Sequence, residues 1–388
     1  MPDREPRVTP LELFFDLVFV FGLTQVTSLM SDDPTWPGLG RGLLVLAAIW
    51  WAWTGYAWLT NTLEPEASAV RAAMVAAMAA LLVVALAVPG AFGEDAVLFA
   101  VAYLVVRLLF LLLYAIAGKH DPELLGAVAR IAPAGLLAPA ILIVAGFLGG
   151  DIRIVLWIAA LTVDYGGALI GRGTGWRVSP AHFAERYGLI VIIALGESIV
   201  AIGVGATGAM LTVGVVTAAT LAIVSLAALW WAYFDVYAVM GERELRAVSG
   251  AARVRFARDH YSYLHLPMVA GVVLFALGLK KTMEHVDEPL DLVPAAALCG
   301  GVALYFFAHV LMRLRSVQVI RRDRGEHPGW FGVGRPTATV ASLALIPVAV
   351  EVTALTALAL VTAVCLVLIV YDVVHYREER AQVREARP

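Results

Sequence analysis

Apolar runs of about 20 residues recur along the whole sequence. Each run is long enough to cross the ~30 Å hydrocarbon core of a bilayer as an α-helix. Twelve runs can be delimited: 10–30, 40–62, 69–89, 95–117, 124–148, 152–172, 183–206, 211–237, 259–279, 293–315, 335–350 and 353–374. Because 61% of the residues are hydrophobic and only 15% are charged, little chain remains for an aqueous domain. The sequence therefore predicts an all-α integral membrane protein with about twelve transmembrane helices.

The Lys and Arg residues predict the orientation of these helices. If the N-terminus lies in the cytoplasm, 23 of the 28 basic residues fall on the cytoplasmic side. Four fall outside (Arg41, Arg153, Lys280 and Lys281), and Arg107 lies within a predicted span. Cytoplasmic connections of membrane proteins are enriched in Lys and Arg. We therefore expect both termini to lie in the cytoplasm.

The two halves of the chain resemble each other weakly but in order. The matches pair Ile49-Trp50-Trp51-Ala52-Trp53 with Leu229-Trp230-Trp231-Ala232-Tyr233, Tyr103-x3-Arg107 with Tyr305-x3-His309, and Val163-Asp164 with Tyr371-Asp372. Each half has six predicted spans, so both halves enter the membrane in the same sense, as in a parallel repeat. We predict a first six-helix repeat over 1–172, a short cytoplasmic seam over 173–182, a second repeat over 183–376 and a charged cytoplasmic tail over 377–388.

Charged side chains inside the predicted spans are the candidate functional residues, because a charge in hydrocarbon requires a partner or water. The candidates for translocation or proton coupling are Glu12, Asp16, Arg107, Asp164, Glu185, Glu197 and His309. Glu197 is the deepest acid, and Thr24, at the equivalent position of the first half, cannot titrate. We therefore expect Glu197 to be the coupling carboxylate of a proton-linked transporter. Arg107 should contact an acid, with Asp16 and Asp164 as the alternatives.

Each candidate also has a structural explanation. Glu12 and Glu185 lie near the predicted cytoplasmic boundary, where a carboxylate can reach water and stabilise a helix N-terminus. Arg107 and its acid could form a structural ion pair. The supporting polar or aromatic candidates are Thr24, Gln25, Ser198, Trp50, Trp230, His265 and Asp372. The tryptophans could pack between helices or line a substrate cavity, and His265 and Asp372 could face the lipid headgroups.

Catalytic and metal-binding signatures are absent from the sequence. It contains no His-Glu-x-x-His, no G-x-S-x-G and no P-loop. Cys299 and Cys365 both lie in apolar runs, so neither a disulfide framework nor a metal site is expected. An enzyme is the least favoured class, and we expect no cofactor and no nucleic acid. Membrane lipid and an unknown small solute or ion are the expected partners, and the oligomeric state stays open.

One basic connection has a helical pattern of its own. Residues 239–258 place apolar side chains on one face and arginines on the other. This pattern predicts either an amphipathic helix in the membrane interface or a loop held near anionic lipid.

The lead spans of the two halves carry the most specific motifs. These are Arg7-Val-Thr-Pro-Leu-Glu-Leu-Phe-Phe-Asp-Leu-Val-Phe-Val20 and Glu185-Arg-Tyr-Gly-Leu-Ile-Val-Ile-Ile-Ala-Leu-Gly-Glu-Ser198. Together they resemble the bacterial low temperature requirement protein A family, over essentially the whole chain. The resemblance implies a multi-pass protein of the bacterial inner (plasma) membrane, linked by name to growth in the cold. It implies no substrate, reaction or functional residue.

These observations leave three alternative classes of function. A secondary transporter, with proton coupling as one form, fits two six-helix halves with buried acids at unequal depths. A two-repeat cation or proton channel is the alternative. It would favour polar rings built evenly by both halves, whereas Asp16 and Glu197 lack acidic counterparts. Phe14-Phe15-Asp16 also resembles the Phe-Ser-Asp motif of two-repeat potassium channels, but Leu189 replaces the acid in the second half. A non-transporting membrane or cold-adaptation protein is the further alternative.

Overall fold

The computed structural model describes residues 7–63, 68–170, 175–208, 210–324 and 332–377. The predicted tail beyond Arg377 and residues 173–174 of the predicted seam lie outside the described residues. In the described part the chain is helical and has no strand; an isolated bridge pairs Pro289 with Thr353. The predicted all-α class is confirmed.

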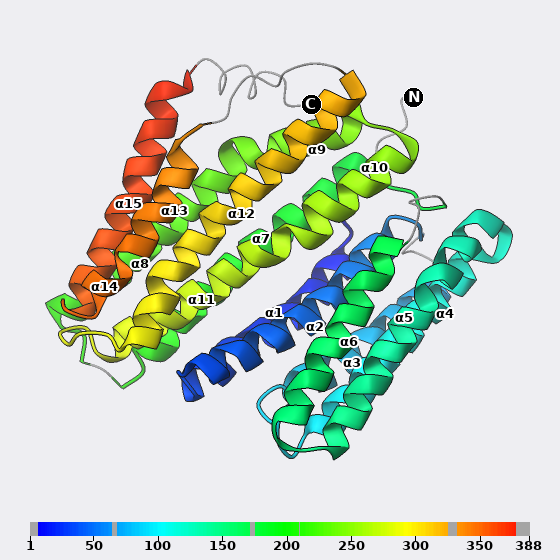
Figure 1. Ribbon diagram of the computed structural model, residues 1–388, viewed down its shortest axis with the longest axis horizontal. Coiled ribbons are helices and arrows are strands. Elements are labelled where there is room, and N and C mark those ends of the chain that lie inside the picture. Colours follow the sequence, from blue (N-terminus) through cyan, green and yellow to red (C-terminus); the bar gives the residue numbers. More distant parts are fainter. Residues whose placement is uncertain (1–6, 64–67, 171–174, 209, 325–331, 378–388) are drawn as a thin grey trace. The chain divides into compact units, whose positions relative to one another are not determined.

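The helices follow the predicted apolar runs (Figure 1). The first part of the chain forms α1 (Pro10–Asp32), α2 (Trp36–Thr60), α3 (Ser68–Leu86), α4 (Ala96–Ala117), the 3-10 turn η1 (Gly118–His120), α5 (Pro122–Phe147), α6 (Gly150–Ile170) and α7 (Pro180–Gly205). The second part forms α8 (Val213–Ala232), the π-helical η2 (Tyr233–Tyr237), α9 (Ala238–Ala247), α10 (Gly250–Phe256), the π-helical η3 (Ala257–Tyr263), α11 (His265–Glu284), α12 (Leu292–Arg324), α13 (Gly334–Ala344), α14 (Ile346–Ala349) and α15 (Ala354–His375).

Side-chain caps and prolines fix several helix starts. Asp121, Thr212 and Thr353 precede α5, α8 and α15, and the side-chain oxygen of each accepts a hydrogen bond from a backbone N–H in the first turn. Such caps satisfy N–H groups that have no partner inside the helix. Pro10 and Pro180 begin α1 and α7, where a missing N–H costs nothing.

Eleven helices in the described residues are long and apolar enough to cross a membrane. The remaining predicted span, 335–350, divides into α13, with 11 residues, and α14, with four. An 11-residue helix is about 16 Å long, shorter than the ~30 Å hydrocarbon core. The chain is therefore a multi-pass helical membrane protein, and the twelve-span count stays a prediction.

The connection 239–258 is not an independent interfacial helix. Its first part, α9, continues α8 through η2, and its second part, α10, leads through η3 into α11. Two continuous helical stretches, 213–247 and 250–284, result. Leu245 and Phe256 have no solvent exposure. The apolar face that suggested contact with lipid is buried in the protein instead.

The chain forms two compact units. The first comprises the described residues within 1–30, 37–186 and 249–258, and the second comprises those within 31–36, 187–248 and 259–388. In the first unit α3, α4, α5 and α6 pack against one another in chain order. In the second, α12 packs between α11 and α13, and α8 packs against α15. This division into units does not test whether the two halves of the chain are related by symmetry. The two-repeat organisation therefore stays a prediction.

Small residues bring α11 and α12 into close contact. A Cβ atom on Gly271 would lie 2.6 Å from the carbonyl oxygen of Gly301, and one on Gly278 would lie 2.5 Å from the Cα atom of Leu298. Because each neighbour is backbone, neither can move aside easily. Close backbone approach at small residues is typical of helix pairs in membranes.

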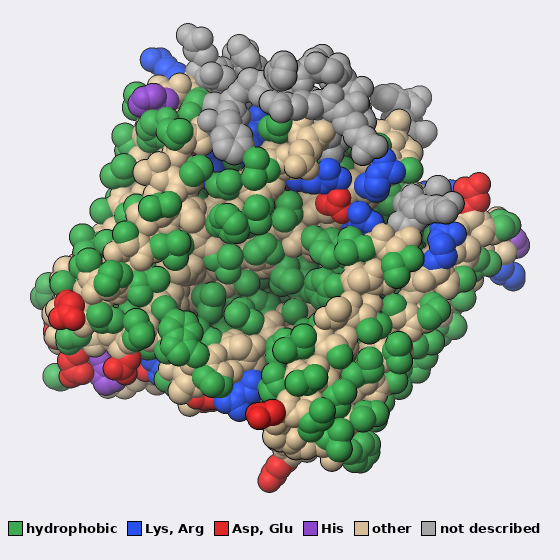
Figure 2. All heavy atoms as spheres, viewed as in Figure 1, with side chains coloured by type: hydrophobic (Ala, Val, Ile, Leu, Met, Phe, Trp, Pro, Cys, Tyr) green, Lys and Arg blue, Asp and Glu red, His purple; other side chains and the backbone are tan. Residues whose placement is uncertain are grey.

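Exposed apolar side chains cover the outer faces of the helices. Figure 2 shows hydrophobic side chains over much of the face in view. Leu112, Val155, Val216 and Val367 are exposed examples from α4, α6, α8 and α15. Such surfaces are expected where helices contact lipid.

Candidate functional site

A buried charged cluster lies between α1, α2 and the start of α7 in the first unit. Glu12 and Asp16 are one turn apart on α1, so their side chains share a face. Asp16 Oδ1 accepts a hydrogen bond from Trp53 Nε1 (2.8 Å) and lies 3.0 Å from Nη2 of Arg186. The side chains of Glu12, Asp16, Trp53 and Arg186 are all 0% exposed.

Glu12 also closes the N-terminus of α1 as part of a capping box. Its Oε2 accepts hydrogen bonds from the N–H (2.8 Å) and hydroxyl (3.0 Å) of Thr9, and the Glu12 N–H donates to Thr9 Oγ1 (3.4 Å). His182 Nε2 lies 3.2 Å from the same carboxylate oxygen. The expected stabilisation of the helix start is confirmed. Contact of Glu12 with water is not, since the side chain is fully buried.

The cluster holds more acidic groups than permanently basic ones. Glu12 and Asp16 contribute two carboxylates, and Arg186 contributes one guanidinium. His182 is charged only when protonated. Among the described residues, no hydrogen bond is made by the Arg186 guanidinium or by Asp16 Oδ2. Because an unbalanced buried charge is costly, this arrangement of two carboxylates and one guanidinium is suited to binding one proton.

A second buried ion pair joins α4, α5 and α6. Arg107 Nη2 lies 2.6 Å from Asp164 Oδ1, and Tyr103 donates its hydroxyl hydrogen to Asp164 Oδ2 (3.1 Å). Arg107 Nε donates to the carbonyl of Gly135 (3.4 Å), where a Cβ atom would lie 2.8 Å from Arg107 Nη2. The expected contact of Arg107 with an acid is confirmed, and Asp164, not Asp16, is the partner. Pairing and bonding of this kind are what a structural ion pair requires.

Buried histidines characterise the second unit. His265 Nε2 lies 2.9 Å from the Tyr233 hydroxyl, and its Nδ1 lies 2.9 Å from the carbonyl oxygen of His260. His309 Nδ1 lies 2.9 Å from the carbonyl oxygen of Tyr305. Both His265 and His309 are fully buried, so the interpretation of His265 as a headgroup-facing residue is wrong. Within the described residues, no group of three or more His, Cys, Asp or Glu side chains could hold a metal ion.

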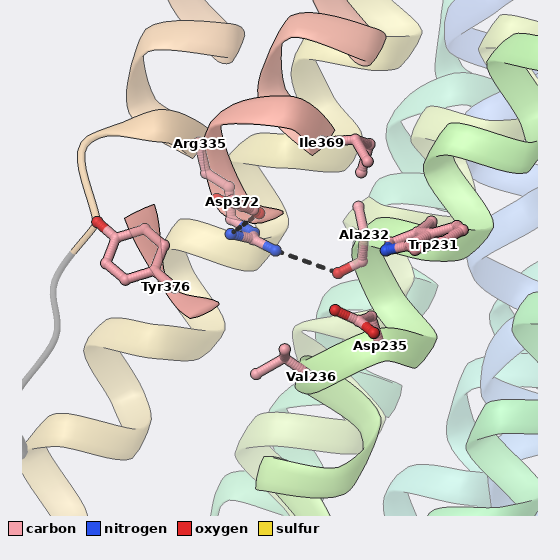
Figure 3. Close-up of a pocket in the computed structure, with 8 residues that line it drawn as sticks. All are labelled: Trp231, Ala232, Asp235, Val236, Arg335, Ile369, Asp372 and Tyr376. Atoms are coloured by element: carbon pink, nitrogen blue, oxygen red, sulfur yellow. Dashed lines mark hydrogen bonds and ion pairs between the residues drawn. The ribbon is translucent and has the colours of Figure 1, made fainter. Parts of the chain in front are cut away.

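Arg335 and Asp372 border a small cavity in the second unit (Figure 3). Arg335 Nη1 lies 2.9 Å from Asp372 Oδ2, its Nη2 donates to the carbonyl of Ala232 (3.2 Å), and its guanidinium lies 4.3 Å from the ring centroid of Tyr237. Asp372 is therefore paired inside the protein, not directed at headgroups. The cavity measures about 10 Å³, room for about one water molecule and too small for an organic solute.

The other polar candidates differ in burial. Glu197 is 2% exposed and Ser198 is fully buried, both on the part of α7 that belongs to the second unit. Thr24 and Gln25 on α1 are half-buried, and Glu185 is exposed. The burial of Glu197 is consistent with its predicted depth, whereas Glu185 can reach solvent.

The two tryptophan candidates also differ. Trp50 is fully buried and packs against Trp53 (ring centroids 5.1 Å apart) and Phe19 (6.4 Å). Trp230 is 46% exposed and stacks on Phe234 (5.6 Å). Packing between helices explains Trp50, and the exposed indole of Trp230 is not equivalent to it.

Sequence reasoning missed Arg186 and His182. It assigned Arg186 to the cytoplasmic basic residues because it lies near the start of a span. The available signal was the four-residue spacing of His182 and Arg186, which places both side chains on one face of α7. That face carries the positive partners that Glu12 and Asp16 require.

Comparison with known proteins shows that the chain matches a protein family. The family model described as "Bacterial low temperature requirement A protein" matches residues 7–370. A protein of Rhizobium meliloti (strain 1021), named "Uncharacterized protein RA0937", is 32% identical over 352 residues, which cover 87% of this chain and 82% of that protein. No solved structure matches.

Proposed function

This chain belongs to the bacterial low temperature requirement A protein family, and on that premise we propose that it is a proton-linked secondary transporter of a small solute or ion. The observation that carries the proposal is the buried contact of Asp16 with Arg186. These two groups and Glu12 form a site with two carboxylates and one fixed positive charge. A proton is the smallest cation that can balance it.

The position of the site supports coupling to a helix movement. Asp16 lies on α1 and Arg186 on α7, far apart in the chain. When Asp16 is ionised, it attracts the guanidinium and holds the two helices together. Protonation removes that attraction, so proton binding can change how firmly α1 and α7 are joined. Two arrangements of α1 and α7 that bind this proton with different affinities would then be in equilibrium. Proton binding shifts that equilibrium toward the arrangement with the higher proton affinity.

Glu197 remains the second candidate for a coupling carboxylate. It is 2% exposed and lies on α7, the helix that also carries Arg186. Glu197→Gln should preserve folding and membrane insertion but abolish pH-dependent transport. If the variant transports with unchanged pH dependence, Glu197 is a structural hydrogen-bonding group.

We further propose a location in the bacterial inner membrane, with both termini in the cytoplasm. The Lys and Arg distribution supports this orientation. The exposed apolar faces of the helices supply the surface for lipid contact.

The deciding experiment separates a transporter from a channel. Purified protein is reconstituted into liposomes that contain a pH-sensitive dye, and a voltage is imposed with valinomycin and a potassium gradient. We expect proton movement no faster than in empty liposomes until a solute is added from a panel of amino acids, sugars, organic cations and organic anions. Voltage-driven proton flux without solute, faster than in empty liposomes, would support a channel. The absence of movement under every condition would contradict transport.

A further inference from the structure

Glu244 is a buried acid that the predicted site did not include. It lies on α9, and its side chain is 10% exposed. Oε1 lies 3.3 Å from Nη1 of Arg313 on α12. Oε2 has no hydrogen-bond partner among the described residues. Arg313 therefore pairs with one oxygen of the Glu244 carboxylate, and Ser316 on the same helix α12 lines the same cavity.

A small polar cavity adjoins this carboxylate. Its polar lining comprises Tyr237, Glu244, His260, Arg313 and Ser316. The cavity measures about 10 Å³, which is enough for about one water molecule. A buried water needs two to four polar partners. Glu244, His260 and Ser316 can supply them from three elements: α9, η3 and α12.

The local backbone brings His260 to the cavity. His260 lies in the π-helical turn η3, a distortion that often occurs at functional sites in helices. On the facing helix, a Cβ atom at Gly241 would lie 3.3 Å from Nε2 of His260 and 2.9 Å from the hydroxyl of Tyr261. Glycine at this position therefore permits the close approach of the imidazole.

The contacts of His260 continue deeper into the unit. Its carbonyl oxygen lies 2.9 Å from Nδ1 of His265, and Nε2 of His265 lies 2.9 Å from the hydroxyl of Tyr233. The charged groups around the cavity are Arg313 beside Glu244 and Arg315, which pairs with Asp259 (2.7 Å). The protonatable side chains that line the cavity itself are those of Tyr237, Glu244 and His260.

We infer that Glu244, one water molecule and His260 form a proton-transfer site. The protonated carboxyl group of Glu244 donates its proton to the water, and the water passes a proton to a ring nitrogen of His260. The products are a carboxylate held by Arg313, an imidazolium and a regenerated water molecule. This inference deepens the proposed proton-linked function, but its test needs no transported solute.

A purely structural ion pair between Glu244 and Arg313 is the competing explanation. In that case the carboxylate stays ionised whenever the protein is folded. A proton-transfer group instead must exist in both protonation states in the folded protein. The two explanations therefore differ in a spectroscopic property of one side chain.

Infrared difference spectroscopy of the purified full-length protein tests this property. During a pH step, wild type should gain a protonated-carboxyl C=O band as the pH falls, and Glu244→Gln should lose one such band. Glu242→Gln is the matched control, because Glu242 lies two residues away on α9 and pairs with Arg246 at the surface (2.8 Å). It should keep the band.

A second variant keeps the test valid if Glu244→Gln does not fold. Ser316→Ala removes a cavity partner and should shift the pH at which the band appears. An unchanged band in Glu244→Gln, or an unchanged pH midpoint in Ser316→Ala, would overturn the inference. Because the spectrum involves no solute, its outcome is independent of solute-driven proton movement, which tests the proposed transport.

Discussion

The Arg186 guanidinium lies 3.0 Å from the Asp16 carboxylate, and neither side chain is exposed. The two residues come from α1 and α7, the first helices of the two predicted repeats. Trp53 holds one oxygen of Asp16 by a hydrogen bond. The other oxygen and the guanidinium N–H groups make no hydrogen bond within the described residues. The pair is therefore held mainly by charge, and this makes it sensitive to a proton.

Removal of Arg186 should expose this dependence on charge. Arg186→Gln leaves Asp16 and Glu12 buried without a permanent cation, so we expect a loss of about 3–5 kcal/mol in unfolding free energy. Unfolding in mixed detergent micelles at neutral pH measures this loss. Adding Asp16→Asn to Arg186→Gln should restore part of the stability. If the double variant is no more stable than the single one, the two side chains do not interact as charges.

The Arg107–Asp164 pair should behave as a structural unit. Asp164→Asn leaves a buried guanidinium without its acid and should cost about 3–5 kcal/mol. Replacing both members with apolar residues, as Arg107→Met and Asp164→Leu, should cost less than the sum of the single replacements. A double-mutant cycle of unfolding free energies gives the coupling energy. Additive effects would contradict a direct interaction.

The close packing of α11 on α12 predicts unequal effects of two glycine substitutions. In Gly278→Ala the new Cβ atom meets the backbone of Leu298 at 2.5 Å, so we expect a loss of about 1–3 kcal/mol. A Cβ atom added to Gly300 on α12 would meet nothing within 4 Å, so Gly300→Ala should be neutral or slightly stabilising. Thermal unfolding in detergent compares the two. Equal stability would show that the helices can separate without cost.

Reporter fusions test the orientation and the number of spans together. With twelve spans, a fusion after residue 92 should report outside and one after residue 388 should report in the cytoplasm. With eleven spans and a cytoplasmic N-terminus, the fusion after 388 should report outside, because α13 and α14 would not cross the membrane. Alkaline phosphatase, active outside, and green fluorescent protein, fluorescent inside, give complementary signals. An internal signal after residue 92 would reverse the predicted orientation.

The helices could be predicted from the sequence because each membrane span is a continuous run of apolar residues. A run of apolar residues is helical in lipid since its backbone groups must bond internally. The run 335–350 forms two shorter helices because Pro347 lies within it, near the break between α13 and α14. The connection 239–258 was misleading. An apolar helix face looks the same in sequence whether it contacts lipid or protein.

The candidate site was only partly predictable, since a partner across helices leaves no local pattern. Arg107 required an acid by energetic argument, and Asp164 was one of two choices. Asp16 was identified as a buried acid, but its cation was not, because Arg186 lies next to the exposed Glu185 and resembles a surface residue. Glu244 was missed for the same reason. Its basic neighbours Arg243 and Arg246 make this segment of the sequence resemble a charged surface.

The most direct test of proton coupling at Asp16 is solute-driven proton movement in proteoliposomes. The solute is the one that moves protons with the wild-type protein, and the internal dye records the pH change. Asp16→Asn should fold and insert but move protons no faster than empty liposomes. The exposed acid Glu185 provides the matched control, and Glu185→Gln should keep solute-driven movement. If Asp16→Asn moved protons as fast as the wild-type protein does, Asp16 would not be the proton-coupling group.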